Sequence, residues 1–159
     1  MKEEITERML TEIGRTEPLP DHEAKQESPL ILAWIGDGIY EMVIRAMLVR
    51  TTGIPGAPVA RMHRRASGLV NAETQSQMVG VWETQQLLTE DEAHVYHRGR
   101  NAKAATHAKN APIQDYRRAT GFEAVLGYLY LTGRMQRIYE LVRDGLAGLK
   151  EKSEENDGR

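Results

Sequence analysis

The feature that most constrains the fold is an apolar stretch at residues 30–41 with an aspartate, Asp37, in its middle. Ser28 and Pro29 precede this stretch, and serine followed by proline is a typical helix start. Apolar residues then recur every three or four positions, which predicts a helix from Pro29 to about Arg50. A carboxylate in such surroundings costs several kcal/mol unless a basic residue pairs with it or a metal or reaction uses it.

A second acid, Glu123, lies within another apolar stretch at residues 121–131. We hypothesise that the two stretches pack together and bring the two carboxylates to one site. Like charges repel, so placing both acids near each other would require a cation. Mg²⁺ prefers oxygen ligands and often takes only one or two protein carboxylates, together with waters and substrate phosphates. Gly36 and Gly38 flank Asp37 and predict close approach of another backbone.

Each acid also has an ordinary structural interpretation. Asp37 could pair with an arginine such as Arg45 or be bonded to backbone at a helix break, and Glu123 has similar alternatives. Glu41 shares a helix face with Asp37 and is interpreted as a salt-bridge or structural residue. The two acids are more informative together, because each lies in the most apolar part of its own segment.

The pattern along the whole chain predicts an all-α protein of about six or seven helices, since no stretch alternates apolar and polar residues as a strand does. Residues 1–28 are interpreted as an N-terminal extension with a short helix at residues 2–14 followed by an irregular lead-in. Residues 29–149 form the predicted main domain. Residues 150–159 are polar and are expected to form a mobile tail.

Two helix starts are visible in the middle of the chain. Pro58 can open a helix that extends to about Gln86. Thr89 and Glu92 form a capping-box pattern, which predicts a short helix through about His97.

The segment that follows is polar and rich in small residues. Residues 99–114 are expected to form one long loop, of the kind that often carries function. Asp115 can cap the next helix, which Gly133 ends, and a last helix is expected over residues 135–149.

Charge is unevenly distributed, although the net value is only −2. Residues 1–28 hold 8 acidic and 4 basic residues and residues 150–159 hold 4 and 3, which leaves 11 and 14 for residues 29–149. The bases gather in two clusters: Arg61, Arg64 and Arg65 with His63, and Arg98, Arg100, Lys103, Lys109, Arg117 and Arg118. Such patches are compatible with a phosphate backbone as partner, and the ordinary alternative is a solvated charged surface.

Cysteine is absent, which excludes disulfides and thiolate metal sites and is compatible with a reducing cytoplasm. The acidic N-terminus has no apolar core of signal-peptide length, and no apolar run reaches membrane-spanning length. The histidines show no zinc-site spacing, and neither a glycine-rich nucleotide loop nor a nucleophile elbow is present. We therefore expect a cytoplasmic protein without membrane contact.

Four segments together resemble the ribonuclease III family. Residues 32–41 (LAWIGDGIYE) resemble the signature helix of its catalytic domain, and residues 66–74 (ASGLVNAET) resemble the next helix. Residues 98–103 (RGRNAK) and 116–131 (YRRATGFEAVLGYLYL) are similar to the Mini-ribonuclease III branch. The segments follow in the family's order over residues 29–146, and their combination is more specific than any one of them.

The resemblance implies an all-α endonuclease domain that forms a two-fold homodimer through the signature helices and lacks an appended double-stranded-RNA-binding domain. It implies Mg²⁺-dependent cleavage of double-stranded RNA, with Mn²⁺ able to substitute. In-line attack would leave 5′-phosphate and 3′-hydroxyl ends. The branch is known for trimming precursor large-subunit ribosomal RNA, which makes this RNA the expected partner.

By position, Asp37 matches the family's catalytic aspartate and Glu123 its metal-binding glutamate, so both are candidate catalytic and metal-binding residues. Candidate RNA-binding residues come from the basic segment, because A-form RNA is recognised mainly by shape and backbone: they are Arg98, Arg100, Asn101 and Lys103.

Two positions depart from the full-length ribonuclease III pattern. Ala33 and Thr120 stand where that pattern has acids, as in the Mini branch, so the number of metal ions held by the protein is open. Two other classes of function are compatible with the sequence. One is a catalytically inactive RNA- or ribosome-binding module, and the other is an all-α protein–protein interaction domain. Metal-dependent cleavage separates the enzyme from both.

Overall fold

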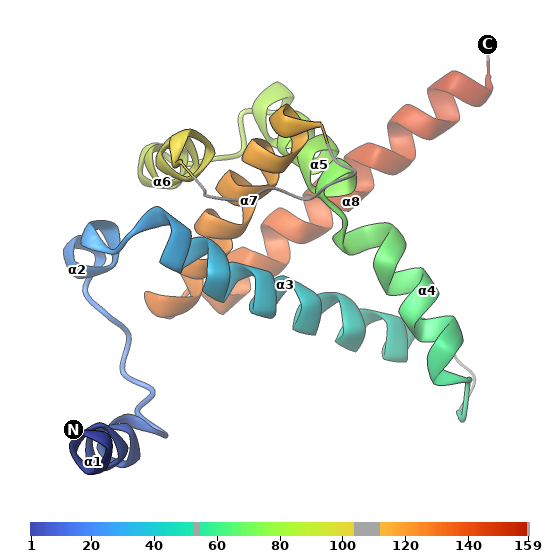
Figure 1. Ribbon diagram of the computed structural model, residues 1–159. Coiled ribbons are helices and arrows are strands. Elements are labelled where there is room, and N and C mark those ends of the chain that lie inside the picture. The colour runs from blue at the N-terminus through green and yellow to red at the C-terminus, as the bar shows by residue number, and fades with distance from the viewer. Residues whose placement is uncertain (53–54, 104–111, 159) are drawn as a thin grey trace.

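The computed structural model describes residues 1–52, 55–103 and 112–158. These residues form eight helices and no strand, which confirms the all-α prediction and corrects the expected number of helices upward (Figure 1). The helices are α1 (Lys2–Glu12), α2 (Asp21–Gln26), α3 (Pro29–Thr51), α4 (Val59–Val70), α5 (Ala72–Thr84), α6 (Glu90–Asn101), α7 (Ile113–Leu131) and α8 (Met135–Asp157).

The single helix predicted from Pro58 to Gln86 is instead two helices, because Asn71 interrupts it. Its backbone is extended, with φ −72° and ψ 160°. The Asn71 side chain accepts a hydrogen bond from Thr74 N at 2.8 Å and donates one to Ser67 O at 2.9 Å. One amide thus satisfies free backbone groups at the end of α4 and the start of α5, which stabilises the break.

The lead-in before α3 is also more ordered than its sequence indicated. It contains the short helix α2, whose Ala24 is fully buried. Arg134 donates two hydrogen bonds of 2.8 Å to the Asp21 carboxylate, and Leu19 N donates to Leu131 O at 2.8 Å. These contacts hold the lead-in against the α7–α8 junction.

Three other boundaries differ from the prediction. Helix α6 continues to Asn101, so the expected loop begins later, and its part at residues 104–111 lies outside the described residues. Pro112, rather than Asp115, is the N-cap of α7. Helix α8 continues to Asp157, beyond its expected end at residue 149, and every described residue from 150 onward is exposed.

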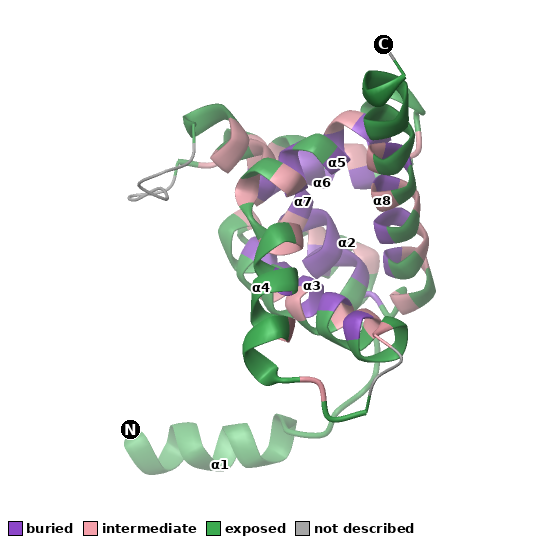
Figure 2. Ribbon diagram, turned by 90° about the vertical axis from the view of Figure 1, so that its right-hand side faces the viewer, coloured by how far each residue is buried: buried purple, intermediate pink, exposed green. Residues whose placement is uncertain are grey.

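Helix α7 forms the centre of the core and contacts α2, α3, α5, α6 and α8 (Figures 1 and 2). Phe122 lies between two other aromatic rings. Its ring stacks on Trp82 with centroids 4.8 Å apart and meets the edge of Tyr40 at 4.9 Å. The apolar positions that predicted separate amphipathic helices therefore converge on one core.

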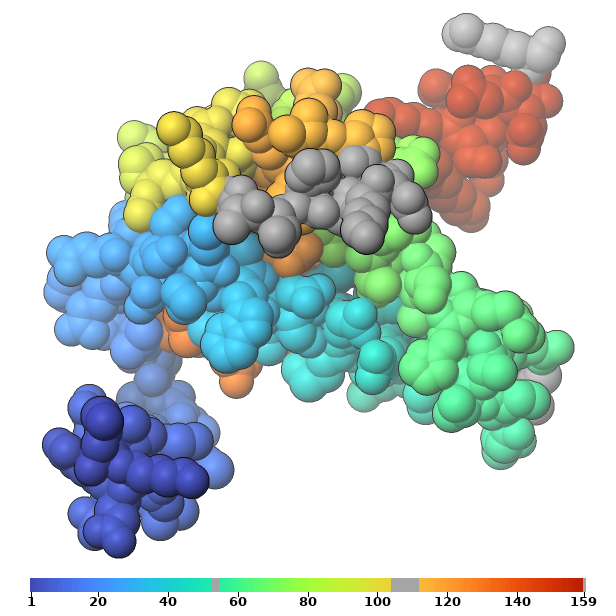
Figure 3. All heavy atoms as spheres, viewed as in Figure 1, coloured from blue at the N-terminus to red at the C-terminus, as the bar shows by residue number. Residues whose placement is uncertain are grey.

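Two helices reach away from this core. Helix α1 has no buried residue and stands apart from the body, with its apolar side chains Ile5, Met9, Leu10 and Ile13 exposed (Figures 2 and 3). Helix α4 extends away from α7 and exposes Arg61, Arg64 and Arg65 (Figure 3). In the described part of the chain, no helix is long and apolar enough to cross a membrane.

The feature of the fold that positions the site is a glycine-lined crossing of α3 and α7. A Cβ atom on Gly36 would lie 1.7 Å from the carbonyl oxygen of Glu123, and one on Gly127 would lie 1.9 Å from that of Leu32. The two backbones are thus in direct contact, as predicted for Gly36. A Cβ atom on Gly38 would meet nothing within 4 Å, so no other backbone of the described chain approaches this glycine.

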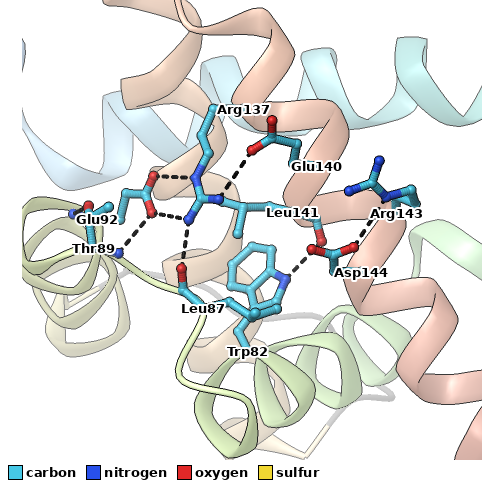
Figure 4. Close-up of polar contacts among 9 residues, drawn as sticks. All are labelled: Trp82, Leu87, Thr89, Glu92, Arg137, Glu140, Leu141, Arg143 and Asp144. Carbon is cyan, nitrogen blue, oxygen red and sulfur yellow. Dashed lines mark hydrogen bonds and ion pairs between the residues drawn. The ribbon is translucent and has the colours of Figure 1, made fainter.

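A buried ion pair fixes the start of α6 against α8 (Figure 4). Arg137 donates to both carboxylate oxygens of Glu92 at 2.9 Å and to Leu87 O at 2.6 Å. Glu92, which is 3% exposed, also accepts from Thr89 N at 3.0 Å and completes the predicted capping box. Beside this network, Trp82 Nε1 donates to Leu141 O at 2.9 Å and connects α5 to α8.

Candidate active site

Asp37 lies in the middle of α3, directly after the glycine that contacts α7. Its side chain is exposed rather than buried, and it forms no hydrogen bond or ion pair with a described residue. The suggested pairing with Arg45 does not occur, since Arg45 Nη2 lies 2.8 Å from Glu41 Oε2 instead. The salt-bridge interpretation of Glu41 is therefore confirmed, and Asp37 stays available for another role.

Glu123 lies on α7 at the crossing itself and is largely buried without a basic partner. Burial raises the pKa of its carboxyl to about 8, and the neighbouring Asp37 charge adds to that increase. The pKa of Asp37 is also raised, first by the protein atoms that partly desolvate its carboxyl and then by the Glu41 charge. The hypothesis that the two acidic segments pack together is confirmed, and the two carboxylates are electrostatic neighbours.

Gln75 is a third member of this site that was not identified from the sequence. It lies in the first turns of α5, is 1% exposed and donates from Nε2 to Val70 O at 3.1 Å. A hydrogen bond from its side chain opposes the increase in the Glu123 pKa, while its Oε1 is buried without a hydrogen-bond partner among the described residues. The available sequence signal was a glutamine at the buried spacing of Met78, Val79 and Trp82.

These groups fit a hard divalent cation. The charged neighbours that shift the pKa values of Asp37 and Glu123 are other carboxylates, so a cation would relieve repulsion at the site. No group of three or more histidine, cysteine or acidic side chains suited to a metal occurs in residues 1–52, 55–103 and 112–158. The two carboxylates are the described groups that could hold such a cation, with water and phosphate oxygens completing its shell.

The four candidate RNA-binding residues lie at the end of α6 but have different surroundings. Arg98 donates hydrogen bonds to Lys25 O and to Glu27 O, which fixes the end of α2. Arg100 lies over the Tyr96 ring at 5.9 Å and donates from Nε to Asn101 Oδ1 at 3.3 Å. Lys103 is exposed just after the helix. Arg98 thus has a structural function in this fold because it connects α6 to the end of α2. Arg100 and Asn101 contact each other at the end of the same helix.

Comparison with known proteins identifies the family. The family model described as the ribonuclease III domain matches residues 30–134, which include Asp37 and Glu123. The Mini-ribonuclease 3 of Clostridium tetani is 42% identical over 142 residues, which are 89% of this chain and 91% of that protein. The Mini-ribonuclease 3 of Enterococcus faecalis is 45% identical over 118 residues, which are 74% of this chain and 87% of that protein.

A solved structure supports the same assignment. The crystal structure of a Fusobacterium nucleatum protein superposes with a TM-score of 0.66 at 26% identity and covers 77% of this chain and 94% of that one. The similarity in sequence therefore extends to the fold over most of the chain. This chain belongs to the ribonuclease III family, in its Mini-ribonuclease 3 branch.

Proposed function

We propose that Asp37 and Glu123 together form the metal site at which this double-stranded-RNA endoribonuclease cleaves its substrate. The observation that carries the proposal is the pair of carboxylates at the α3–α7 crossing, neither of which forms an ion pair with a described basic residue. Two neighbouring carboxylates without a basic partner do not stabilise the fold, because the charge on one makes ionisation of the other less favourable. They form a site that a divalent cation and a phosphate can complete.

The chemistry that a bound Mg²⁺ supplies here is activation of a water molecule and neutralisation of charge on the scissile phosphate. Glu123 must lose its proton to act as a ligand, and the same cation favours that loss. Asp37 faces solvent, where an RNA backbone can reach it. The contact between Gly36 and the Glu123 backbone holds the two acids in a fixed relation, and Gln75 restrains the Glu123 carboxyl. Mn²⁺, with similar oxygen ligands, is proposed as a substitute.

We further propose that the products carry 5′-phosphate and 3′-hydroxyl ends and that precursor large-subunit ribosomal RNA is a substrate in the cytoplasm. The basic residues at the end of α6 support this proposal, because A-form RNA is recognised mainly through its phosphates and 2′-hydroxyls. Among them, Arg100, Asn101 and Lys103 are less committed to the fold than Arg98.

A second copy of this chain is the proposed partner of the exposed face of α3. Trp34, Met42 and Val49 are 74%, 52% and 68% exposed and follow one face of this helix at steps of seven or eight residues. Large exposed side chains in one stripe mark an interface, and a two-fold axis beside α3 would bury the stripe of each copy on the other. The dimer would then present two carboxylate sites to the two strands of one RNA duplex.

The test is cleavage of a long double-stranded RNA by wild-type protein and by Asp37→Asn, with Mg²⁺ and with chelator. We expect cutting by the wild type only when metal is present and a loss of at least about 100-fold in Asp37→Asn, because one of two metal-binding carboxylates is removed. Glu41→Gln is the matched control, since it alters a neighbouring acid that already pairs with Arg45.

The outcomes separate the functions. Cutting by Asp37→Asn at the wild-type rate would contradict the assigned site. Binding of RNA without cutting, with Mg²⁺ or with Mn²⁺, would instead favour a catalytically inactive RNA- or ribosome-binding module. Circular dichroism of Asp37→Asn checks that its fold is intact, as expected for an exposed side chain.

A further inference from the structure

A polar pocket of about 420 Å³ lies where α5, α6 and the start of α7 meet. Its volume is in the ordinary range of ligand sites, about 300–1,000 Å³. The described residues that line it are mainly polar or basic: Glu83, Tyr96, Arg100, Asn101, Gln114, Arg117 and Arg118.

The pocket contains two buried hydrogen-bond donors that reach no protein acceptor. Tyr96 is 2% exposed, and the Arg118 side chain lies beside its Oη and opposes the increase in the pKa of this hydroxyl, but no described residue accepts the hydroxyl proton. The Nε of Arg118 is also buried and unpaired. Buried polar groups in folded proteins nearly always have partners, because leaving one unpaired costs about 1–3 kcal/mol. Two such donors in one pocket therefore indicate that a ligand supplies the acceptor.

Charge specifies the kind of acceptor. Arg100, Arg117 and Arg118 contribute three positive charges to the pocket. Glu83 is its one acid among the described lining residues, and its Oε1 lies 3.6 Å from Arg118 Nη2 with the side chain 53% exposed. A neutral hydroxyl donor beside several guanidinium groups matches the oxygens of a phosphate, which accept several hydrogen bonds at once.

We propose that this pocket is a phosphate-binding site, separate from the carboxylate site, in which Tyr96 Oη and the guanidinium of Arg118 hold the phosphate oxygens. Arg100 and Arg117 supply further positive charge at its edge. Its natural occupant is a backbone phosphate of the RNA, an assignment that rests on the proposed function. A free phosphate or phosphomonoester shares the same chemistry and is distinguished by the experiment below.

Helix geometry keeps the two sites apart. Arg118 precedes Glu123 by five residues, which is about 7–8 Å along the axis of α7 and places the two side chains on different faces. Gly121, between them, packs against the Tyr96 ring, whereas the Glu123 backbone contacts Gly36 on α3. The pocket therefore cannot serve as part of the metal site, but one RNA duplex could contact both.

The first experiment measures binding of inorganic phosphate by its effect on the melting temperature, against chloride at equal ionic strength and without divalent metal. Phosphate should raise the melting temperature of the wild type, because a ligand that binds only the folded state stabilises it. Tyr96→Phe and Arg118→Gln should lose this response. Tyr96→Phe keeps the buried ring and removes only the hydroxyl beside Arg118, so it should stay folded in chloride, and its response to phosphate is measured from its own melting temperature there. Arg143→Gln, on the exposed surface of α8, is the charge-matched control and should respond like the wild type.

The second experiment measures affinity for double-stranded RNA by fluorescence anisotropy in chelator, over a series of salt concentrations. We expect Tyr96→Phe to weaken binding about 10-fold, as for a lost hydrogen bond to a charged group. Arg117→Gln should reduce the slope of log affinity against log salt by about one.

Each outcome decides the assignment. Loss of the phosphate response together with weaker RNA binding supports a site for an RNA phosphate. Loss of the phosphate response with unchanged RNA affinity supports the site but assigns it to a free phosphate or phosphomonoester. An equal phosphate response in wild type, Tyr96→Phe and Arg118→Gln overturns the proposal. Neither readout involves metal or cleavage, so failure here is distinct from failure of the proposed nuclease function.

Discussion

At the scale of single residues, the surroundings of Glu123 are the strongest indication of function. Its carboxyl has a pKa near 8 because it is buried at a helix crossing and because Asp37 lies beside it. Ionisation of such a buried acid destabilises the folded protein. A bound cation can take the place of the proton, so the acid is suited to a metal site. The same property makes the role of Glu123 measurable without RNA.

We expect the metal-free protein to lose stability as pH rises from about 5 to 8. The folded state holds the Glu123 proton up to a pKa of about 8, whereas the unfolded chain releases it near the ordinary glutamate pKa of 4.5. The stabilisation is therefore complete below 4.5 and is lost as pH rises to the folded pKa, at most about 1.4 kcal/mol per pH unit. Urea unfolding of wild type and Glu123→Gln in chelator checks this, and equal pH slopes in the two proteins would contradict it.

Gln75 is expected to tune the protonation of Glu123. In Gln75→Leu, loss of the hydrogen bond that opposes the pKa increase should raise the Glu123 pKa further and move the rising limb of the cleavage rate to higher pH. The variant also loses the hydrogen bond from Nε2 to Val70 O, and removal of the unpaired Oε1 offsets part of that loss, so the free energy of unfolding should fall by about 1–2 kcal/mol. A pH–rate profile measures the shift, and an unchanged profile would limit Gln75 to a packing role.

At the scale of helices, the crossing of α3 and α7 depends on the absence of side chains at Gly36 and Gly127. Because the carbonyl of Glu123 would lie 1.7 Å from a Cβ on Gly36, the backbones would have to separate to admit one methyl group. Separation of these helices would displace Asp37 from Glu123, so the crossing links stability to activity.

Gly36→Ala should lower the free energy of unfolding by about 3 kcal/mol or more, at the upper end of overpacking effects, because a backbone carbonyl cannot rotate away. Gly68→Ala is the matched control, since a Cβ there meets nothing within 4 Å. It should raise stability by about 0.5–1 kcal/mol through helix propensity. Chemical denaturation of both variants tests the pair, and equal effects would show that the close crossing is not required.

The helix boundaries show what local patterns can specify. The capping box at Thr89 and Glu92 was predictable, because its hydrogen bonds join residues three apart. The break at Asn71 was not identified, since apolar periodicity continues across it and an asparagine can lie within a helix as well as cap one. The same limit applies to α2, where only packing on α7 and the Arg134–Asp21 contact reveal an ordered helix.

At the scale of the whole molecule, the exposed apolar stripe on α3 is not explained by packing within one chain. Trp34 is 74% exposed on the helix that carries Asp37, so the proposed interface and the candidate site share one element.

We expect Trp34→Glu to be monomeric under conditions in which the wild type sediments as a dimer. A charge would be buried without a partner in the two-fold interface, which costs several kcal/mol in each copy. Tyr139→Glu, with a 48% exposed aromatic residue on α8, is the matched control and should sediment like the wild type. Analytical ultracentrifugation measures both, and a dimer that persists in Trp34→Glu would place the interface elsewhere.

The sequence by itself determined the helical class, the two acidic segments and the glycine beside Asp37, because helix periodicity and capping are local properties of the chain. Tertiary structure alone decided the partner of each side chain. Arg45 forms an ion pair with Glu41, and Arg98 donates to backbone carbonyls more than 70 residues away. The Gln75 side chain forms a hydrogen bond with Glu123. The tertiary structure also left Tyr96 and Arg118 facing a pocket with unpaired donors. Such partners depend on which helices pack together and at what distance, and the local sequence around each residue does not specify that geometry.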